Sequence, residues 1–249
     1  MAAQIEVKIP KKYLLTEELI EEFQLLNLDM RIGKGNENTL LIAESDFCFD
    51  DYEYIELKFP TLVFPDSDFD ALYEINPSEL NFEQPGDHSI LIKMGVFDTI
   101  SQITAAILNT IFNWAIPDRG RVRAETGEYE FKDESGNLKR YMSDVSYISF
   151  EKVPEEEQKK WKTRIPIPPT LSIEIVSAPK SLKATLHKMR DVWINYGTDL
   201  GVVVCPFSKK LFVFEHNKKG YKEQSIYKPF THPLLPEFEG NFSMYVDEV

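Results

Sequence analysis

Residues 168–214 read "PPTLSIEIVSAPKSLKATLHKMRDVWINYGTDLGVVVCPFSKKLFVF" and combine the signals of one strand, one helix and two further strands. The first strand begins at Thr170 and places a single acid, Glu174, among apolar neighbours. The helix that follows, over 181–196, carries an apolar stripe at steps of three and four residues, and Gly197 stands where a left-handed helix end is expected. With the elements upstream, this order predicts an α/β (α+β) core with a mixed sheet flanked by helices.

Glu174 needs an explanation, because a carboxylate removed from water without a partner is costly. A second acid in an apolar strand, Asp144 of "SDVSYIS", precedes it by 30 residues. If the two strands are neighbours, the carboxylates converge on a site suited to Mg²⁺ or Mn²⁺, which prefer oxygen ligands. The alternative is that each acid pairs with a nearby Lys or Arg, or lies at a strand end near solvent. The spacing leaves both interpretations open.

The upstream chain contains helical and hairpin patterns in a repeated order. A helical pattern over 16–28 precedes a hairpin pattern over 30–43, and a second helix–hairpin pattern over 68–94 indicates a duplicated unit. The aromatic and acidic segment 46–66 between the copies has the character of an edge or packing segment. An amphipathic helix is predicted over 98–116.

These patterns predict three parts of the chain. Residues 1–67 form an acidic N-terminal extension that contains the first helix–hairpin copy. Residues 68–230 form the main domain, and residues 231–249 form a C-terminal tail.

The charge is distributed unevenly along the chain. The net charge is −13, yet residues 1–100 carry 21 Asp and Glu against 7 Lys and Arg, and residues 101–249 carry 20 against 21. The acidity therefore belongs to the N-terminal part, and the total charge does not exclude DNA as a partner. Basic clusters at 159–164, 180–190 and 218–222 are either solvated surface or contacts to such a partner.

The sequence lacks the signals of several other protein classes. No apolar run approaches the roughly 20 residues of a membrane helix, and the first residues lack the layout of a signal peptide. The two cysteines, Cys48 and Cys205, have no metal-type spacing, so a reducing cytoplasm is the expected location. The sequence contains no HExxH, GxSxG, P-loop or GxGxxG motif.

Several blocks, in order along the chain, carry a family resemblance. They are "LNFEQPGDHSILIKM", "ISQITAAILNTIFNW", "AETGEYEF" with "ESGN", "YMSDVSYIS", and the stretch 168–214. From about residue 80 to 215 the chain resembles the Uma-two family of restriction endonucleases, which is abundant in cyanobacteria and other bacteria. The resemblance implies the restriction-endonuclease-like PD-(D/E)XK fold and a divalent-metal-dependent DNA endonuclease that hydrolyses phosphodiester bonds.

The resemblance also implies roles for individual residues. Asp144 and Glu174 stand at the metal-binding acids, the backbone carbonyl of Ile175 is a further ligand of Mg²⁺ or Mn²⁺, and Glu83 stands at the family's hairpin acid. The usual strand lysine is replaced here by Val176. In this family the lysine has moved into the next helix, where Lys188 occupies its position and orients or deprotonates the attacking water.

The chain departs from the family pattern at two positions. Ser143 replaces the proline before the motif aspartate, a change that is expected to be tolerated because this residue shapes the backbone and binds no ligand. Ala106 stands where the family usually has a helix glutamate, and this departure is the more serious one. Fewer carboxylates predict weaker metal binding, so the alternative is a catalytically degenerate nuclease fold that acts as a binding or regulatory module. In a third interpretation, the acidic N-terminal part mimics nucleic acid. Paired nucleases often act as dimers, so a homodimer is expected by analogy.

Overall fold

The computed structural model describes residues 4–28, 30–44, 54–59, 66–76, 80–86, 88–93, 98–125, 127–132, 136, 138–162 and 164–249. The chain divides into two compact units. Unit 1 comprises residues 1–95 and 132–140, and unit 2 comprises residues 96–131 and 141–249. Much of the segment 46–66 lies outside the described residues.

Unit 1 contains the same arrangement of elements twice. The first copy is β1 (Gln4–Lys8), α1 (Glu17–Leu26), β2 (Met30–Lys34) and β3 (Thr39–Glu44); the second is β4 (Tyr54–Lys58), α2 (Asp66–Ile75), β5 (Asn81–Gly86) and β6 (Ser89–Lys93). In each copy the first strand pairs antiparallel with the last, which gives the strand orders β1-β3-β2 and β4-β6-β5. The strand β9 (Leu138–Met142) adds a pairing between Gln84 and Arg140.

An asparagine at the end of each helix joins the two copies of unit 1. Asn27 follows α1, and its side chain bonds both the N–H and the C=O of Lys58, at 3.0 and 3.1 Å. Asn76 follows α2 and makes the same pair of bonds to Lys8, at 2.7 and 2.9 Å. Each asparagine also donates to the last turn of its own helix, so it satisfies helix-end and strand-end groups together. The contact is therefore reciprocal, as in a two-fold interface.

One hydrophobic core serves both copies. Among the described residues it takes eight buried side chains from each: Val7, Ile9, Leu15, Phe23, Met30, Ile32, Leu40 and Ile42 from the first, and Ile55, Leu57, Phe59, Phe69, Leu72, Phe82, Ile90 and Ile92 from the second. The rings of Phe23 and Phe59, one from each copy, meet edge to face with centroids 4.8 Å apart.

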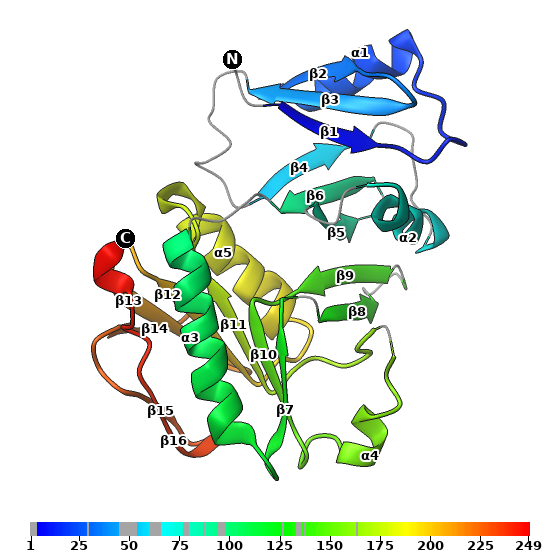
Figure 1. Ribbon diagram of the computed structural model, residues 1–249. Coiled ribbons are helices and arrows are strands. Elements are labelled where there is room, and N and C mark those ends of the chain that lie inside the picture. The colour runs from blue at the N-terminus through cyan, green and yellow to red at the C-terminus, as the bar shows by residue number, and fades with distance from the viewer. Residues whose placement is uncertain are drawn as a thin grey trace. The chain divides into compact units, whose positions relative to one another are not determined.

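Unit 2 is built on a six-stranded mixed sheet (Figure 1). Its helices and strands are α3 (Asp98–Ala115), β7 (Gly120–Ala124), β8 (Glu128–Lys132), β10 (Val145–Ser149), α4 (Glu155–Gln158), β11 (Leu171–Ile175), η2 (Pro179–Ser181), α5 (Leu182–Lys188), η3 (Met189–Ile194), β12 (Leu200–Cys205), β13 (Lys210–Glu215), β14 (Lys222–Ser225), β15 (Phe230–His232), β16 (Leu235–Gly240) and η4 (Val246–Glu248). Strands β8 and β9 each cross the boundary between the units at one end. The sheet order is β14-β13-β12-β11-β10-β7, and β11 and β12 are its parallel pair. The segment from η2 to η3 makes the crossover that a parallel pair requires.

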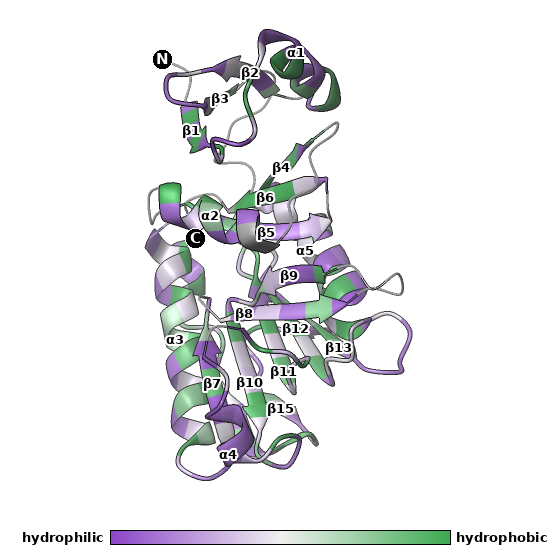
Figure 2. Ribbon diagram, turned by 90° about the vertical axis from the view of Figure 1, so that its right-hand side faces the viewer, coloured by the Kyte–Doolittle hydropathy of each residue, from purple (hydrophilic) through white to green (hydrophobic). Residues whose placement is uncertain are grey.

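Helices cover both faces of this sheet. On one face, Ile173 and Ile175 of β11 share a core with the stripe of α3, which includes Ile103 and Ile107. Bands of hydrophobic and hydrophilic residues alternate along α3 (Figure 2). On the other face, Val203 of β12 packs with η3 residues. Because successive strand side chains point to opposite faces, Glu174 belongs to the α5–η3 side.

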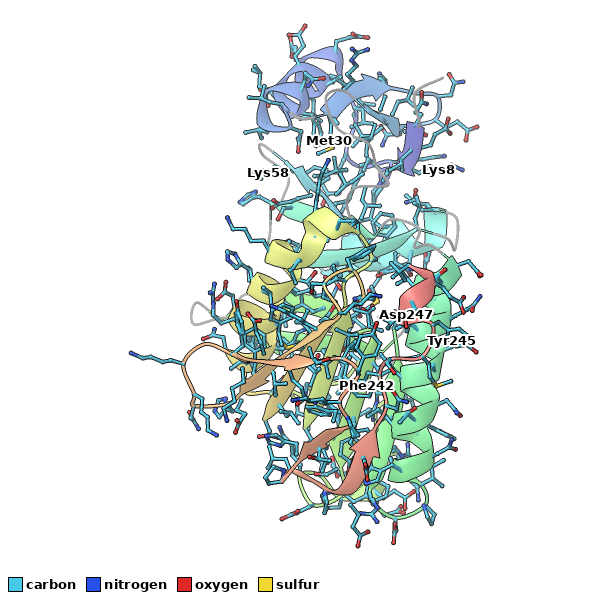
Figure 3. All side chains as sticks on the ribbon, turned by 90° about the vertical axis from the view of Figure 1, so that its left-hand side faces the viewer. Lys8, Met30, Lys58, Phe242, Tyr245 and Asp247 are labelled. Atoms are coloured by element: carbon cyan, nitrogen blue, oxygen red, sulfur yellow. The ribbon has the colours of Figure 1, made fainter. Side chains whose placement is uncertain are left out.

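The C-terminal residues belong to the core of unit 2. Phe230, Leu235, Phe238, Phe242 and Val246 are buried in the cluster that contains the α3 stripe. The segment labelled at Phe242, Tyr245 and Asp247 runs beside α3 (Figure 3). No helix among the described residues is long and apolar enough to cross a membrane.

Candidate active site

The site begins where β10 and β11 lie side by side. The two strands are antiparallel, with Val145 opposite Ile173. Asp144 immediately precedes β10, so the register brings it to the part of β11 that carries Glu174. Its Oδ2 accepts the N–H of Ile175 at 2.7 Å. Asp144, directly before β10, therefore contacts Ile175, the residue that follows Glu174 on the neighbouring strand β11.

Ser143 holds this junction in place. Its hydroxyl lies 2.9 Å from the carbonyl of Val145, 3.1 Å from the carbonyl of Ile173 and 2.9 Å from the hydroxyl of Ser172. These contacts tie the backbone before Asp144 to β11. A proline has no hydroxyl, so Ser143 positions the aspartate by hydrogen bonds where a proline would act through backbone restraint.

Glu174 is fully buried, and both of its carboxylate oxygens are engaged. Lys188, the last residue of α5, places its Nζ 3.3 Å from Oε2. Trp193 of η3 donates its indole N–H to Oε1 at 2.6 Å. The Lys188 ammonium also donates to the carbonyl of Met142 at 3.0 Å, and its side chain is 11% exposed. A cation and a neutral donor thus compensate the burial of the carboxylate.

An aromatic cluster surrounds Trp193. The rings of Tyr129, Phe131 and Tyr141 meet the indole at steep angles, with centroids 5.2, 5.9 and 6.5 Å away. Burial raises the pKa of Tyr129 to about 12, so its hydroxyl stays protonated near neutral pH and donates to Ser146 at 2.7 Å. The indole is therefore packed on several sides and its N–H direction is fixed.

The remaining predicted residue, Glu83, lies on β5 in unit 1. It is buried, whereas Asp144, Glu174 and Lys188 belong to unit 2. Its part in the site stays a prediction. The catalytic and metal-binding roles of the other residues also stay predictions, as does the metal role of the Ile175 carbonyl.

The comparisons with known proteins address the family. A family model described as "Uma2: Putative restriction endonuclease" matches residues 66–247. The chain belongs to the Uma2 family. The resemblance found in the sequence is thereby confirmed, and the model's match extends beyond the 80–215 range of the sequence blocks. No curated protein matches the chain.

A solved structure shares the fold of this Uma2 chain. It is described as a putative nuclease belonging to DUF820 from Anabaena variabilis, with a TM-score of 0.59 and 18% sequence identity. The match covers 73% of this chain and 96% of the other. The mixed α+β, nuclease-like fold predicted from the sequence is confirmed.

The donor atoms of the Uma2 site suit a hard cation. Asp144 and Glu174 offer only oxygen, the ligand type that Mg²⁺ and Mn²⁺ prefer. Within the described part of the chain, no cluster of three or more His, Cys, Asp or Glu side chains is arranged to hold a metal ion. A cation here would depend on two carboxylates, backbone oxygen and water, which fits Mg²⁺ because this ion keeps several of its waters.

The helix α3 adds no carboxylate next to Ala106. Its one acid is Asp98 at its first residue, and the Asp98 carboxylate accepts the side-chain N–H of Gln102 at 2.7 Å. Ala106 lies beside the stripe residue Ile107, which packs on the sheet face opposite Glu174. The acid that the sequence comparison found missing at Ala106 is therefore not replaced within α3.

Sequence reasoning missed two residues that shape the site. The steps of three and four residues place Trp193 in the apolar stripe of the predicted helix, and Ser143 is expected only to shape the backbone before Asp144. The sequence offers one indication of the role of Trp193: a tryptophan in a buried stripe usually donates its N–H to an acceptor nearby. For Ser143 no local pattern indicated contacts to a strand 29 residues away.

Proposed function

We propose that this Uma2 protein is a divalent-metal-dependent DNA endonuclease that hydrolyses phosphodiester bonds. The observation that carries the proposal is the convergence of Asp144, Glu174 and Lys188 at one end of two neighbouring strands. This combination of two acids and a lysine suits phosphoryl chemistry, in which charge stabilisation and positioning supply most of the catalysis.

Each residue has a definite role in this proposal. Asp144, Glu174 and the carbonyl of Ile175 would hold Mg²⁺ or Mn²⁺. Such an ion, when bound, neutralises charge on the phosphate and lowers the pKa of a bound water. Lys188, already fixed by Glu174 and the Met142 carbonyl, would orient the attacking water or bind a phosphate oxygen.

Plasmid nicking by the purified full-length chain tests this function. With Mg²⁺ or Mn²⁺ the wild type should relax supercoiled DNA, and E174Q and K188M should each abolish the cleavage. The matched control is K183M, because Lys183 is an exposed lysine of the same helix. Cleavage by E174Q at the wild-type rate would show that the activity does not arise at this site.

A second function, a non-catalytic binding or regulatory module, is favoured by one observation. The acids of the site are few, since α3 supplies none near Ala106, and Lys188 already balances the charge of Glu174. Calorimetric titration with Mn²⁺ separates the two functions. Heat of binding in the wild type that is absent in E174Q supports the nuclease, and no heat in either supports the binding module.

The proposal extends to assembly and location. Paired nucleases often act as dimers to cut both strands of a duplex, so by analogy we propose a homodimer that acts on DNA in the cytoplasm. Light scattering coupled to size-exclusion chromatography measures the mass directly. A mass of one chain at micromolar concentration, with and without DNA, contradicts the dimer.

A further inference from the structure

The helix that carries Lys188 changes type directly after that residue. The sequence predicts one continuous helix over 181–196, but the segment Met189–Ile194 is a π-helix. Its wide turn appears in a bond that spans five residues, from the N–H of Asn195 to the C=O of Arg190 at 3.1 Å. Single π turns inside α-helices are rare and occur often at functional sites.

The π segment has a geometric consequence for Glu174. Lys188 and Trp193 are five residues apart, and an α-helix of 3.6 residues per turn would point them about 140° apart. Here both side chains reach the same carboxylate, one at each oxygen. Hydrogen bonding over five residues widens the turn, so residue 193 lies more nearly over residue 188 than in an α-helix.

A glycine of the neighbouring strand β12 leaves room for the π segment. A Cβ on Gly201 of β12 would lie 2.2 Å from the Sδ of Met189, the first residue of η3. The absence of a side chain at Gly201 therefore lets η3 approach β12 closely. Two sets of contacts therefore fix the position of the π segment: the close approach to β12 at Gly201, and the packing of aromatic rings around Trp193.

We infer that Trp193 is a positioning residue of the site, and that the π turn is the device that brings it to Glu174. The inference rests on the proposed nuclease function. The indole N–H holds Oε1, so the carboxylate plane is fixed and Oε2 is directed to the side of Lys188. Hydrogen-bond partners of metal-binding side chains commonly set ligand orientation, and their loss typically lowers metal affinity about 10- to 100-fold.

Trp193→Phe tests the inference, because phenylalanine keeps an aromatic ring and removes the N–H. The matched control is Trp114→Phe, which removes an indole N–H bonded to the carbonyl of Pro236 at 2.9 Å, in a different part of unit 2. By calorimetry W193F should bind Mg²⁺ at least ~10-fold more weakly than W114F. With DNA as substrate, kcat should fall while KM stays unchanged, because Trp193 acts through Glu174. Equal Mg²⁺ affinity in the two variants would overturn the inference.

A second measurement does not depend on activity or on the folding of W193F. In spectra of ¹⁵N-tryptophan-labelled protein, the indole resonance of Trp193 should move on adding Mg²⁺ and should move again in E174Q, whereas that of Trp114 should not. If the wild type binds no Mg²⁺, the proposed function fails. In that case the comparison of E174Q with the wild type still tests the Trp193–Glu174 contact. An indole resonance of Trp193 at the same position in both proteins would overturn the inference.

Discussion

Replacing Lys188 with methionine tests the ion pair on which the burial of Glu174 depends. Methionine retains much of the apolar stem of lysine and removes the ammonium that lies 3.3 Å from Glu174 Oε2. With an effective dielectric constant of 20, two unit charges at this distance attract by about 5 kcal/mol. Removing one partner of a buried pair usually costs about 3–5 kcal/mol. The indole N–H of Trp193 remains on Oε1, so we expect the lower end, about 3 kcal/mol of unfolding free energy.

Urea unfolding followed by tryptophan fluorescence measures this loss. All three tryptophans, Trp114, Trp161 and Trp193, lie in unit 2, so the signal reports on the unit that contains the pair. The K183M control should stay within ~0.5 kcal/mol of wild type, as exposed substitutions usually do. The double variant K188M/E174Q should recover most of the lost stability, because no unpaired charge then remains. If K188M matches K183M, or if the effects of K188M and E174Q are additive, Glu174 does not depend on Lys188.

Two further predictions concern other parts of the molecule. Asn76→Ala should leave the N–H and C=O of Lys8 unpaired, and Asn27→Ala should do the same at Lys58, each lowering the free energy of unfolding by about 1–3 kcal/mol. Amide hydrogen exchange should show the lost protection at Lys8 and Lys58, and the substitution of the exposed Asn36 by alanine is the unaffected control. Burial raises the pKa of Tyr129 and of Tyr147 to about 12 from an ordinary value of 10, so the protonated form is favoured in the folded state. Their contribution to stability is therefore fully present below about pH 10 and is lost as the pH rises toward 12. Tyr129→Phe should make the alkaline unfolding of unit 2 less steep, and an unchanged profile would contradict the assignment.

The predictable part of the fold is the part encoded by local periodicity. Alternating apolar residues identified the strand around Glu174, whereas the spacing to Asp144 left open whether the two strands are neighbours, which the pairing of β10 with β11 shows. The same periodicity gave a single α-helix over 181–196, because the stripe through Met189 and Trp193 fits steps of three and four. The π turn after Lys188 depends on contacts with Gly201 and with rings far away in sequence, which no local pattern contains.

The site was predictable to the same extent. The positions of Asp144, Glu174 and Lys188 followed from ordered motifs, and the structure brings these residues together. The alternative pairing of Glu174 with a basic residue is also present, since Lys188 forms that pair. The structure thus shows the charge pairing of Glu174, and metal ligation by the same carboxylate stays a prediction.

The reciprocal asparagine contacts of unit 1 decide how its acidity can be investigated. Excising residues 1–65 would remove eleven of the sixteen side chains of the shared core, because Ile55, Leu57 and Phe59 of the second copy are lost together with the first copy. It would also leave Asn76 without Lys8, so the rest of unit 1 would lose its fold together with its charge. Any functional loss after such a truncation would be uninterpretable as an effect of charge. The exposed acids of α1, Glu17, Glu18, Glu21 and Glu22, offer a cleaner experiment, because glutamine at these positions removes charge and leaves the interlocked halves intact.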